Sequence, residues 1–153
     1  MATIIVSNAF SINMLPEWRW EPDYIEEDED LEEHSYLTTP VVIQPITLEQ
    51  ARAIANSNSL ISAVGHEPTA QLFSSLLGRR IQYRRAHLEL GPGEDVMLVG
   101  QYRGPRLEEG ATELPEGAKI RWALVCMADF VEDVEAISAD LDEIICEAEG
   151  TGE

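Results

Sequence analysis

The 153-residue sequence is poor in basic residues, histidine and cysteine, and it has no long apolar run. Ten Lys and Arg stand against 29 Asp and Glu, a formal net charge of −19, which disfavours a partner such as duplex nucleic acid. No apolar stretch is long enough to span a bilayer, and the first residues lack the pattern of a signal peptide. We therefore expect a cytoplasmic protein with no membrane partner, in the host cell if the protein is viral.

Cysteine and histidine are too scarce for most metal or disulfide frameworks. Cys126 and Cys146 are far apart in sequence, and two isolated cysteines indicate a reducing compartment rather than a disulfide scaffold. The three histidines form no cluster with cysteines or carboxylates at ligand spacing. The sequence therefore predicts no metal site and no other cofactor.

The negative charge is concentrated in two segments. Residues 17–33 hold ten acids and one Arg, and residues 129–153 hold ten acids and no base. Nine acids and nine bases remain elsewhere, with four arginines at 79, 80, 84 and 85 and two more at 103 and 106. A neutral body with concentrated Arg is suited to a compact anion, whereas the acidic segments would repel a long duplex.

Periodicity predicts strands in the first half at residues 2–6 and in the extended stretch 36–46. A helical turn is expected within 9–15, limited by Pro16, and residues 16–34 are expected to form an acidic inserted loop. Thr47 and Gln50 have capping-box spacing and predict a helix to about residue 55. A second helix is expected over 68–77, between Pro68 and Gly78.

In the second half, we expect a hairpin of strands 79–90 and 95–103 around residues 91–94. A loop follows over 104–118 and a strand over 119–128. Apolar residues at helical spacing from Phe130 predict an amphipathic acidic helix that packs on the body or on a partner. The fold class is α/β, with a mixed sheet flanked by helices in one domain over 1–128, including the insertion 16–34, and an acidic tail over 129–153.

Two segments carry candidate ligand-binding groups. Asn8, Ala9, Phe10, Ser11 and Asn13 follow the first strand, where ligands of α/β sheets tend to bind, although a plain capped turn has the same pattern. Gly65-His66-Glu67 precedes a helix, so His66 would lie near free backbone N–H groups, a common anion site. A lone histidine there is more often a solvent-facing turn residue.

The arginine-rich region adds candidate phosphate contacts. On a strand, Arg85 would share a face with Tyr83 and His87, and Arg84 would point the other way. Arg106 and Glu109 belong to a loop with two bases and two acids, which is equally typical of a surface turn with weak ion pairs. Taken singly, these residues do not indicate a binding site.

The ordered set Asn8–Leu15, Gly65–Leu72 with Leu76-Leu77-Gly78 behind it, and Arg106–Gly110 resembles the viral ring nuclease family. That family comprises type III anti-CRISPR enzymes, first catalogued as an uncharacterised domain of archaeal viruses. The likeness covers about residues 3–127. The acidic stretch 16–34 and the tail after 128 depart from the family pattern, and whether this copy is viral or host-encoded stays open.

The resemblance implies a homodimer that binds cyclic tetra-adenylate in a shared cleft and cuts it to linear di-adenylates, which switches off type III CRISPR signalling. By position, His66 corresponds to the family's catalytic histidine. Arg85, Arg106 and Glu109 correspond to its charged active-site residues. Asn8, Ser11 and Asn13 correspond to its ligand-lining segment.

The chemistry expected of such a site needs no metal. The ribose 2′-hydroxyl of the ring is the nucleophile, and its attack on the adjacent phosphorus leaves a 2′,3′-cyclic phosphate. In this hypothesis His66 protonates the leaving oxygen, Arg85 and Arg106 stabilise charge, and Glu109 is the base or orients an arginine. The catalytic set is thus His66, Arg106 and Glu109, with Gly65 and Arg85 among the binding residues.

Three other functions stay open on the sequence. A sponge would bind the cyclic nucleotide without cutting it. A nucleic-acid-binding viral regulator would show salt-dependent binding. An interaction protein could use its acidic segments to mimic nucleic acid, and deletion of 17–33 would then abolish its function.

Overall fold

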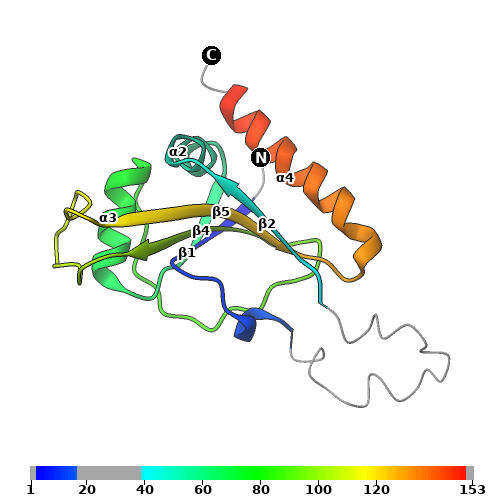
Figure 1. Cartoon of the computed structure of the whole chain (residues 1–153), viewed down its shortest axis with the longest axis horizontal. Coiled ribbons are helices and arrows are strands. Elements are labelled where there is room, and N and C mark those ends of the chain that lie inside the picture. Colours follow the sequence, from blue (N-terminus) through cyan, green and yellow to red (C-terminus); the bar gives the residue numbers. More distant parts are fainter. Residues whose placement is uncertain (1–2, 17–38, 151–153) are drawn as a thin grey trace.

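The computed structural model describes residues 3–16 and 39–150, which form a five-stranded sheet and three α-helices (Figure 1). The strand order is β2-β5-β4-β1-β3. Strand β1 (Thr3–Ser7) lies between β3 (Ser59–Ala63) and β4 (Val96–Arg103) and is parallel to both. Strand β5 (Lys119–Met127) is antiparallel to β4 and to β2 (Val41–Ile46). The expectation of an α/β fold with a mixed sheet is confirmed.

The helices form where the sequence has capping signals. Helix α2 (Leu48–Ser57) begins with a complete capping box, in which the Thr47 side chain accepts from Gln50 N–H and the Gln50 side chain accepts from Thr47 N–H. Helix α3 (Glu67–Leu77) has Pro68 in its first turn and ends at Gly78, whose φ of 67° closes the helix. The 3-10 turn η1 (Ile12–Met14) fulfils the expectation of a helical turn before Pro16.

All three α-helices cover the same face of the sheet (Figure 1). Helix α4 (Val134–Gly150) follows the short turn η4 (Val131–Asp133) and packs on α2 and β2. Its buried residues Ile137, Leu141 and Ile145 belong to the main core, so the acidic tail packs on the body. The helix-free face carries a smaller cluster that includes Ile5, Met97 and Leu90.

Close approach to the sheet fixes the position of α3. Phe73 of α3 and Trp122 of β5 have ring centroids 4.9 Å apart, and both pack over Gly100 of β4. A Cβ added at Gly100 would lie 2.5 Å from the Trp122 ring and 2.8 Å from the Phe73 ring. Only glycine leaves room for this contact, which sets how the helix that begins after His66 lies on the sheet.

The expected hairpin of 79–90 with 95–103 is wrong. Residues 79–90 form no strand, and their one bridge, Val64 with Tyr83, is isolated. Strand β4 cannot pair with them because β1 and β5 already occupy both its edges. Some of its backbone groups bond to other parts of the chain instead: Arg84 N–H donates to the Val64 carbonyl and Ile81 N–H to Ser74 Oγ. The expected alternation of Arg84 and Arg85 across a strand therefore fails.

Other boundaries differ by smaller amounts. Strand β3 was not expected, because its serine-rich sequence resembles the fading end of a helix rather than an alternating strand. The expected strand 36–46 is shorter, since β2 begins at Val41 and residues 36–38 lie outside the described chain. Of the acidic insertion 16–34, only Pro16 is described. The described residues contain no helix that is long and apolar enough to cross a membrane.

Candidate functional site

The carboxyl ends of three parallel strands meet at one edge of the sheet. Because β1, β3 and β4 run in the same direction, the chain leaves all of them on the same side. It leaves β1 at Asn8, β3 just before Gly65 and β4 at Gly104. This is the place where open α/β sheets usually bind ligands.

A pocket of about 280 Å³ lies at this edge. It brings together three of the sequence-predicted site residues, Asn8, His66 and Arg106. Its other lining residues come from α3 and from β4 and the loop after it: Thr69, Tyr102, Gly104, Pro105 and Leu107. The three sequence motifs, more than 90 residues apart along the chain at their extremes, thus converge on one surface hollow.

His66 stands at the N-cap of α3. Its backbone is extended, with φ of −137° and ψ of 116°, and its side chain makes no capping hydrogen bond. The ring instead lies with Nδ1 2.7 Å from Thr69 Oγ1. Since Thr69 engages Nδ1, Nε2 is the ring nitrogen left for proton transfer to a ligand.

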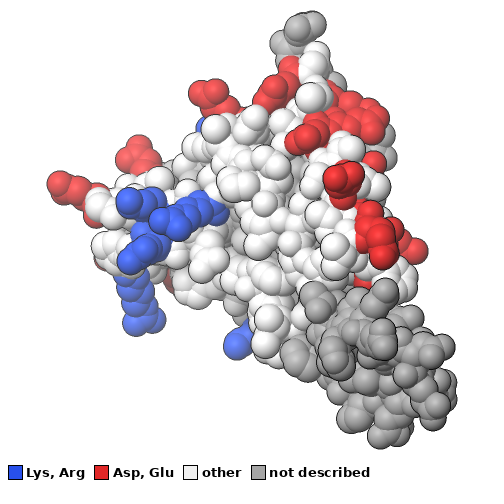
Figure 2. Space-filling view, turned by 45° about the vertical axis from the view of Figure 1, so that its right-hand side comes forward, with Lys and Arg blue, Asp and Glu red and all other residues white. Residues whose placement is uncertain are grey.

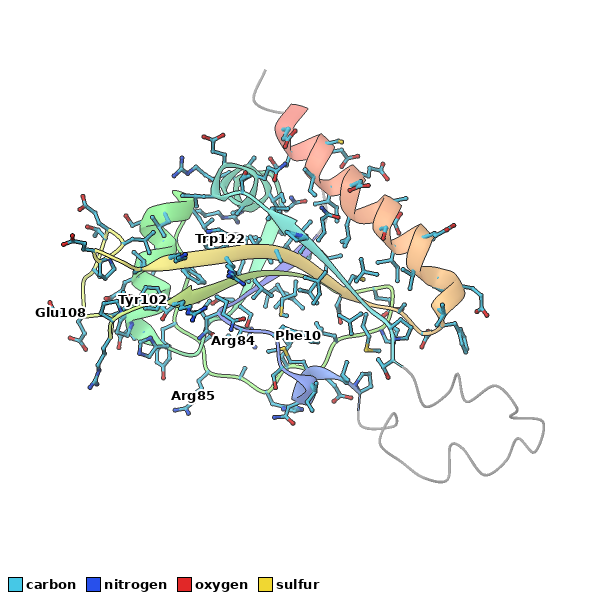
Figure 3. The ribbon with its side chains drawn as sticks, viewed as in Figure 1. Phe10, Arg84, Arg85, Tyr102, Glu108 and Trp122 are labelled. Carbon is cyan, nitrogen blue, oxygen red and sulfur yellow. The ribbon has the colours of Figure 1, made fainter. Side chains whose placement is uncertain are left out.

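Gly65 and Arg85 lie next to this pocket. Gly65 N–H donates to Asn8 Oδ1 at 3.4 Å, which ties the chain after β3 to the chain after β1. A Cβ added at Gly65 would lie 3.5 Å from Cγ of Arg85, so the two residues are in contact. The exposed Arg85 side chain extends away from the sheet (Figure 3). The contact with Gly65 places Arg85 beside the pocket, outside its lining.

The rest of the first motif has structural contacts. Ser11 Oγ accepts from Asn13 N–H at 3.2 Å and caps η1, and the Asn13 side chain is exposed. Ala9 exchanges hydrogen bonds with the Ser7 side chain. Phe10 packs on the helix-free face of the sheet (Figure 3). Of this motif, only Asn8 lines the pocket.

Glu109 lies on the loop that carries Arg106, two residues beyond the last lining residue, Leu107. Both Glu109 and Arg106 are exposed, whereas Leu107 is buried and anchors the start of the loop. Within one chain the structure brings Arg106 into the pocket with His66 and leaves Glu109 outside the lining.

The arginine cluster has mixed roles. Arg79 donates through Nη1 to the carbonyl oxygens of Ala55 and Asn58, so it holds the end of α2. Arg80 and Arg84 are exposed. Sequence reasoning could have separated Arg79, which directly follows the helix-ending Gly78, from the others.

A cationic patch lies across the ends of β4 and β5, on the face of the sheet opposite the α-helices. Arg103 and Lys119 are direct cross-strand partners, and Arg121 pairs with Gln101 two residues further along. Because side chains alternate along strands, Arg103, Lys119 and Arg121 share one face. Within the described ranges, no Asp or Glu pairs with them at salt-bridge distance. Like charges directly opposite each other are unfavourable unless an anion offsets them.

In Figure 2, Lys and Arg side chains gather at one end of the visible face, with a few Asp and Glu beside them, and more Asp and Glu line the other side. Exposed acids along α4 include Glu135, Asp142 and Glu143. The acids of α4 therefore lie apart from the end where Lys and Arg gather. The described part of the chain contains no group of three or more His, Cys, Asp or Glu side chains that could hold a metal ion.

The sequence analysis did not single out Thr69, which contacts His66, or Tyr102, which shapes the loop before Arg106. Thr69 falls three residues after His66, the spacing at which a helix N-cap and its first turn meet, and this spacing was the available signal. Tyr102 donates through its hydroxyl to the Pro105 carbonyl oxygen at 2.6 Å and shapes the turn before Arg106. Nothing in the sequence marks that contact, because it depends on where β4 ends.

A family model described as STIV B116-like matches residues 5–119. The solved structure of B116 of Sulfolobus turreted icosahedral virus is similar, with a TM-score of 0.56 and 26% sequence identity. The match covers 82% of this chain and 99% of that one. Uncharacterized protein 26 of Sulfolobus islandicus filamentous virus (isolate Iceland/Hveragerdi) is 32% identical over 65 residues. That alignment spans 42% of this chain and about half, 53%, of the curated relative.

Proposed function

Since the chain belongs to the STIV B116-like family of archaeal viral proteins, we propose that it is a ring nuclease of cyclic tetra-adenylate. Two copies bind the ring between them and cut it to linear di-adenylates without a metal ion. This activity would switch off type III CRISPR signalling. The proposal combines the family with the resemblance of three motifs to viral ring nucleases.

The observation that carries the proposal is the pocket that joins Asn8, His66 and Arg106. A proton donor, a cation and an amide are the groups that a phosphodiester needs for positioning, charge stabilisation and leaving-group protonation. Arg103, Lys119 and Arg121, on the other face of the sheet, add positive potential at the same end of β4 and β5. A surface turn formed by one segment would not bring together groups from three distant segments.

The proposed reaction is an internal transesterification. The ribose 2′-oxygen forms a bond to the adjacent phosphorus, and the bond from phosphorus to the 5′-oxygen breaks. Nε2 of protonated His66 gives its proton to the departing 5′-oxygen, and Arg106 offsets charge on the phosphate oxygens. Glu109 accepts the 2′-proton; if Glu109 only orients Arg106, a solvent water accepts that proton. The products carry a 2′,3′-cyclic phosphate and a 5′-hydroxyl.

The size of the pocket supports a site shared between two chains. About 280 Å³ is at the small end of ligand pockets, so it holds one part of a four-nucleotide ring. A two-fold axis would place a second identical pocket against the opposite part of the ring, since isologous dimers repeat the same surface. Each copy would then cut one of two opposite linkages.

A sponge that binds the ring without cutting it is the second candidate. The open surface and the exposure of His66 and Glu109 are equally compatible with binding alone. The decisive difference is turnover. The chain is incubated with cyclic tri-, tetra- and hexa-adenylate in excess EDTA, and the products are identified by mass spectrometry.

The proposed function predicts linear di-adenylates with a 2′,3′-cyclic phosphate from the tetra-adenylate ring. Tight binding with an intact ring would establish the sponge. Activity that disappears in EDTA and returns with a divalent ion would overturn the metal-independent reaction.

A further inference from the structure

The loop that carries Arg106 and Glu109 has few apolar contacts beyond its first residues. Leu107 is buried, but no residue from 108 to 117 is. A pocket of about 570 Å³ is lined by part of this loop, by α3 and by residues 80–83, with Gln71, Gly110 and Thr112 among its lining residues. The loop is thus not held against the helix by continuous packing, and other contacts must fix its position.

Two hydrogen bonds between α3 and the loop fix the loop's position. Gly110 N–H donates to Gln71 Oε1 at 2.5 Å, and Ser75 Oγ donates to the Thr112 carbonyl oxygen at 2.8 Å. Gln71 and Ser75 are four residues apart, so they lie on the same stripe of the helix. The two bonds therefore hold successive parts of the loop on one side of α3.

The first bond acts on the peptide that follows Glu109. The Gly110 N–H belongs to the planar Glu109–Gly110 peptide unit, so its direction limits the orientation of the Glu109 backbone. Gly110 has φ of 81°, a conformation that glycine adopts without steric cost. A turn with such freedom needs an external contact to select one orientation, and Gln71 provides it.

We propose that Gln71 is a positioning residue for Glu109, with Ser75 as a second anchor of the same loop. Helix α3 then positions both His66, at its N-cap, and the loop of Glu109, through Gln71 about 7.5 Å further along its axis. The catalytic part of this inference rests on the proposed ring nuclease activity. The anchoring part rests on the two hydrogen bonds alone.

The test compares Gln71→Leu, which removes the acceptor, with Gln71→Glu, which keeps an acceptor oxygen at the same reach. Amide hydrogen exchange at Gly110 is measured by NMR on the full chain, without ligand. We expect faster exchange in Gln71→Leu and exchange close to that of the parent in Gln71→Glu. Unchanged exchange in Gln71→Leu would overturn the anchor, whether or not the chain is a nuclease.

Single-turnover cleavage and ring binding are then measured for the same variants. A displaced Glu109 should slow cleavage by Gln71→Leu about tenfold or more, since misplacement of about 1 Å can cost a hundredfold in rate. Ring affinity should stay within about threefold, and Gln71→Glu should restore the rate, because an acceptor oxygen is again present.

A Glu109→Gln background separates positioning from general destabilisation. If Gln71 acts through Glu109, adding Gln71→Leu there should change the rate less than about twofold, because coupled residues are not additive. A full-sized second loss, or a Gln71→Leu variant that cuts as fast as the parent, overturns the positioning role. A parent that does not cut at all overturns the proposed function instead, and the exchange experiment still judges the anchor.

Discussion

At the scale of single residues, the candidate site contains one histidine, His66, whose ring is oriented by a contact with Thr69. Thr69 Oγ1 lies 2.7 Å from Nδ1 of His66. The His66 side chain makes no capping hydrogen bond to the first turn of α3, and the residue is exposed. The sequence predicted Asn8, His66 and Arg106 as site residues, and the pocket joins them. The alternative that the sequence offered for the first motif, a plain capped turn, fits Ser11, which caps η1. The packing of Phe10 in a core cluster was not predicted, because it depends on the path of the chain after β1.

Replacing Arg106 with Ala should weaken ring binding and slow cleavage together, because an arginine on phosphate acts in the ground state and the transition state. Loss of one charge-assisted contact corresponds to roughly tenfold to a hundredfold in affinity. The matched control is Arg52→Ala on α2, where Nε donates to the Leu76 carbonyl. Equilibrium binding and single-turnover rates measure both. Equal behaviour of the two variants would remove Arg106 from the site.

At the scale of elements, the sequence predicted the helices and strands that are marked by short, local sequence patterns. The capping box of α2, the proline and glycine at the ends of α3 and the apolar spacing of α4 are all confirmed. Strand β3 and the path of residues 79–90 depend on pairing with distant strands, which no local pattern specifies. The parallel pairing of β4 with β1, which brings Arg106 to the site, was missed for this reason.

Helix α4 is expected to be part of the folded body rather than an appendage. Leu141→Ala should lower the free energy of unfolding by about 2–5 kcal/mol, because Leu141 is fully buried in the main core. Asp142→Ala, on the exposed side of the same helix, should change it by no more than about 0.5 kcal/mol. Denaturant unfolding measures both variants, and similar small effects would mean that α4 contributes little to the core.

At the scale of the whole molecule, a small pocket and the distance of the α4 acids from the basic end are what the proposed compact anion would require. The acids of α4 lie away from the end where Lys and Arg gather (Figure 2), so a long nucleic acid that followed the cationic patch would meet repulsion beyond it. The proposed ring of four nucleotides is short enough to avoid that repulsion.

The assembly expected from this description has two chains and one ring. Titration of the chain with cyclic tetra-adenylate should reach saturation at one ring per two chains, since each pocket holds part of the ring. Sedimentation of the free chain should give a dimer at micromolar concentration. One ring per chain, or a monomer that cuts at full rate, would contradict the shared site.

The most direct test of the account is single-turnover cleavage of cyclic tetra-adenylate by His66→Ala, in EDTA, beside His87→Ala as control. His87 is exposed outside the pocket lining, 4.0 Å from a Glu89 oxygen, and its loss should leave the rate unchanged. Loss of His66 should slow cleavage by about two to four powers of ten, the usual contribution of a positioned acid or base, while ring binding survives. A His66→Ala variant that cuts the ring as fast as the parent would contradict the account.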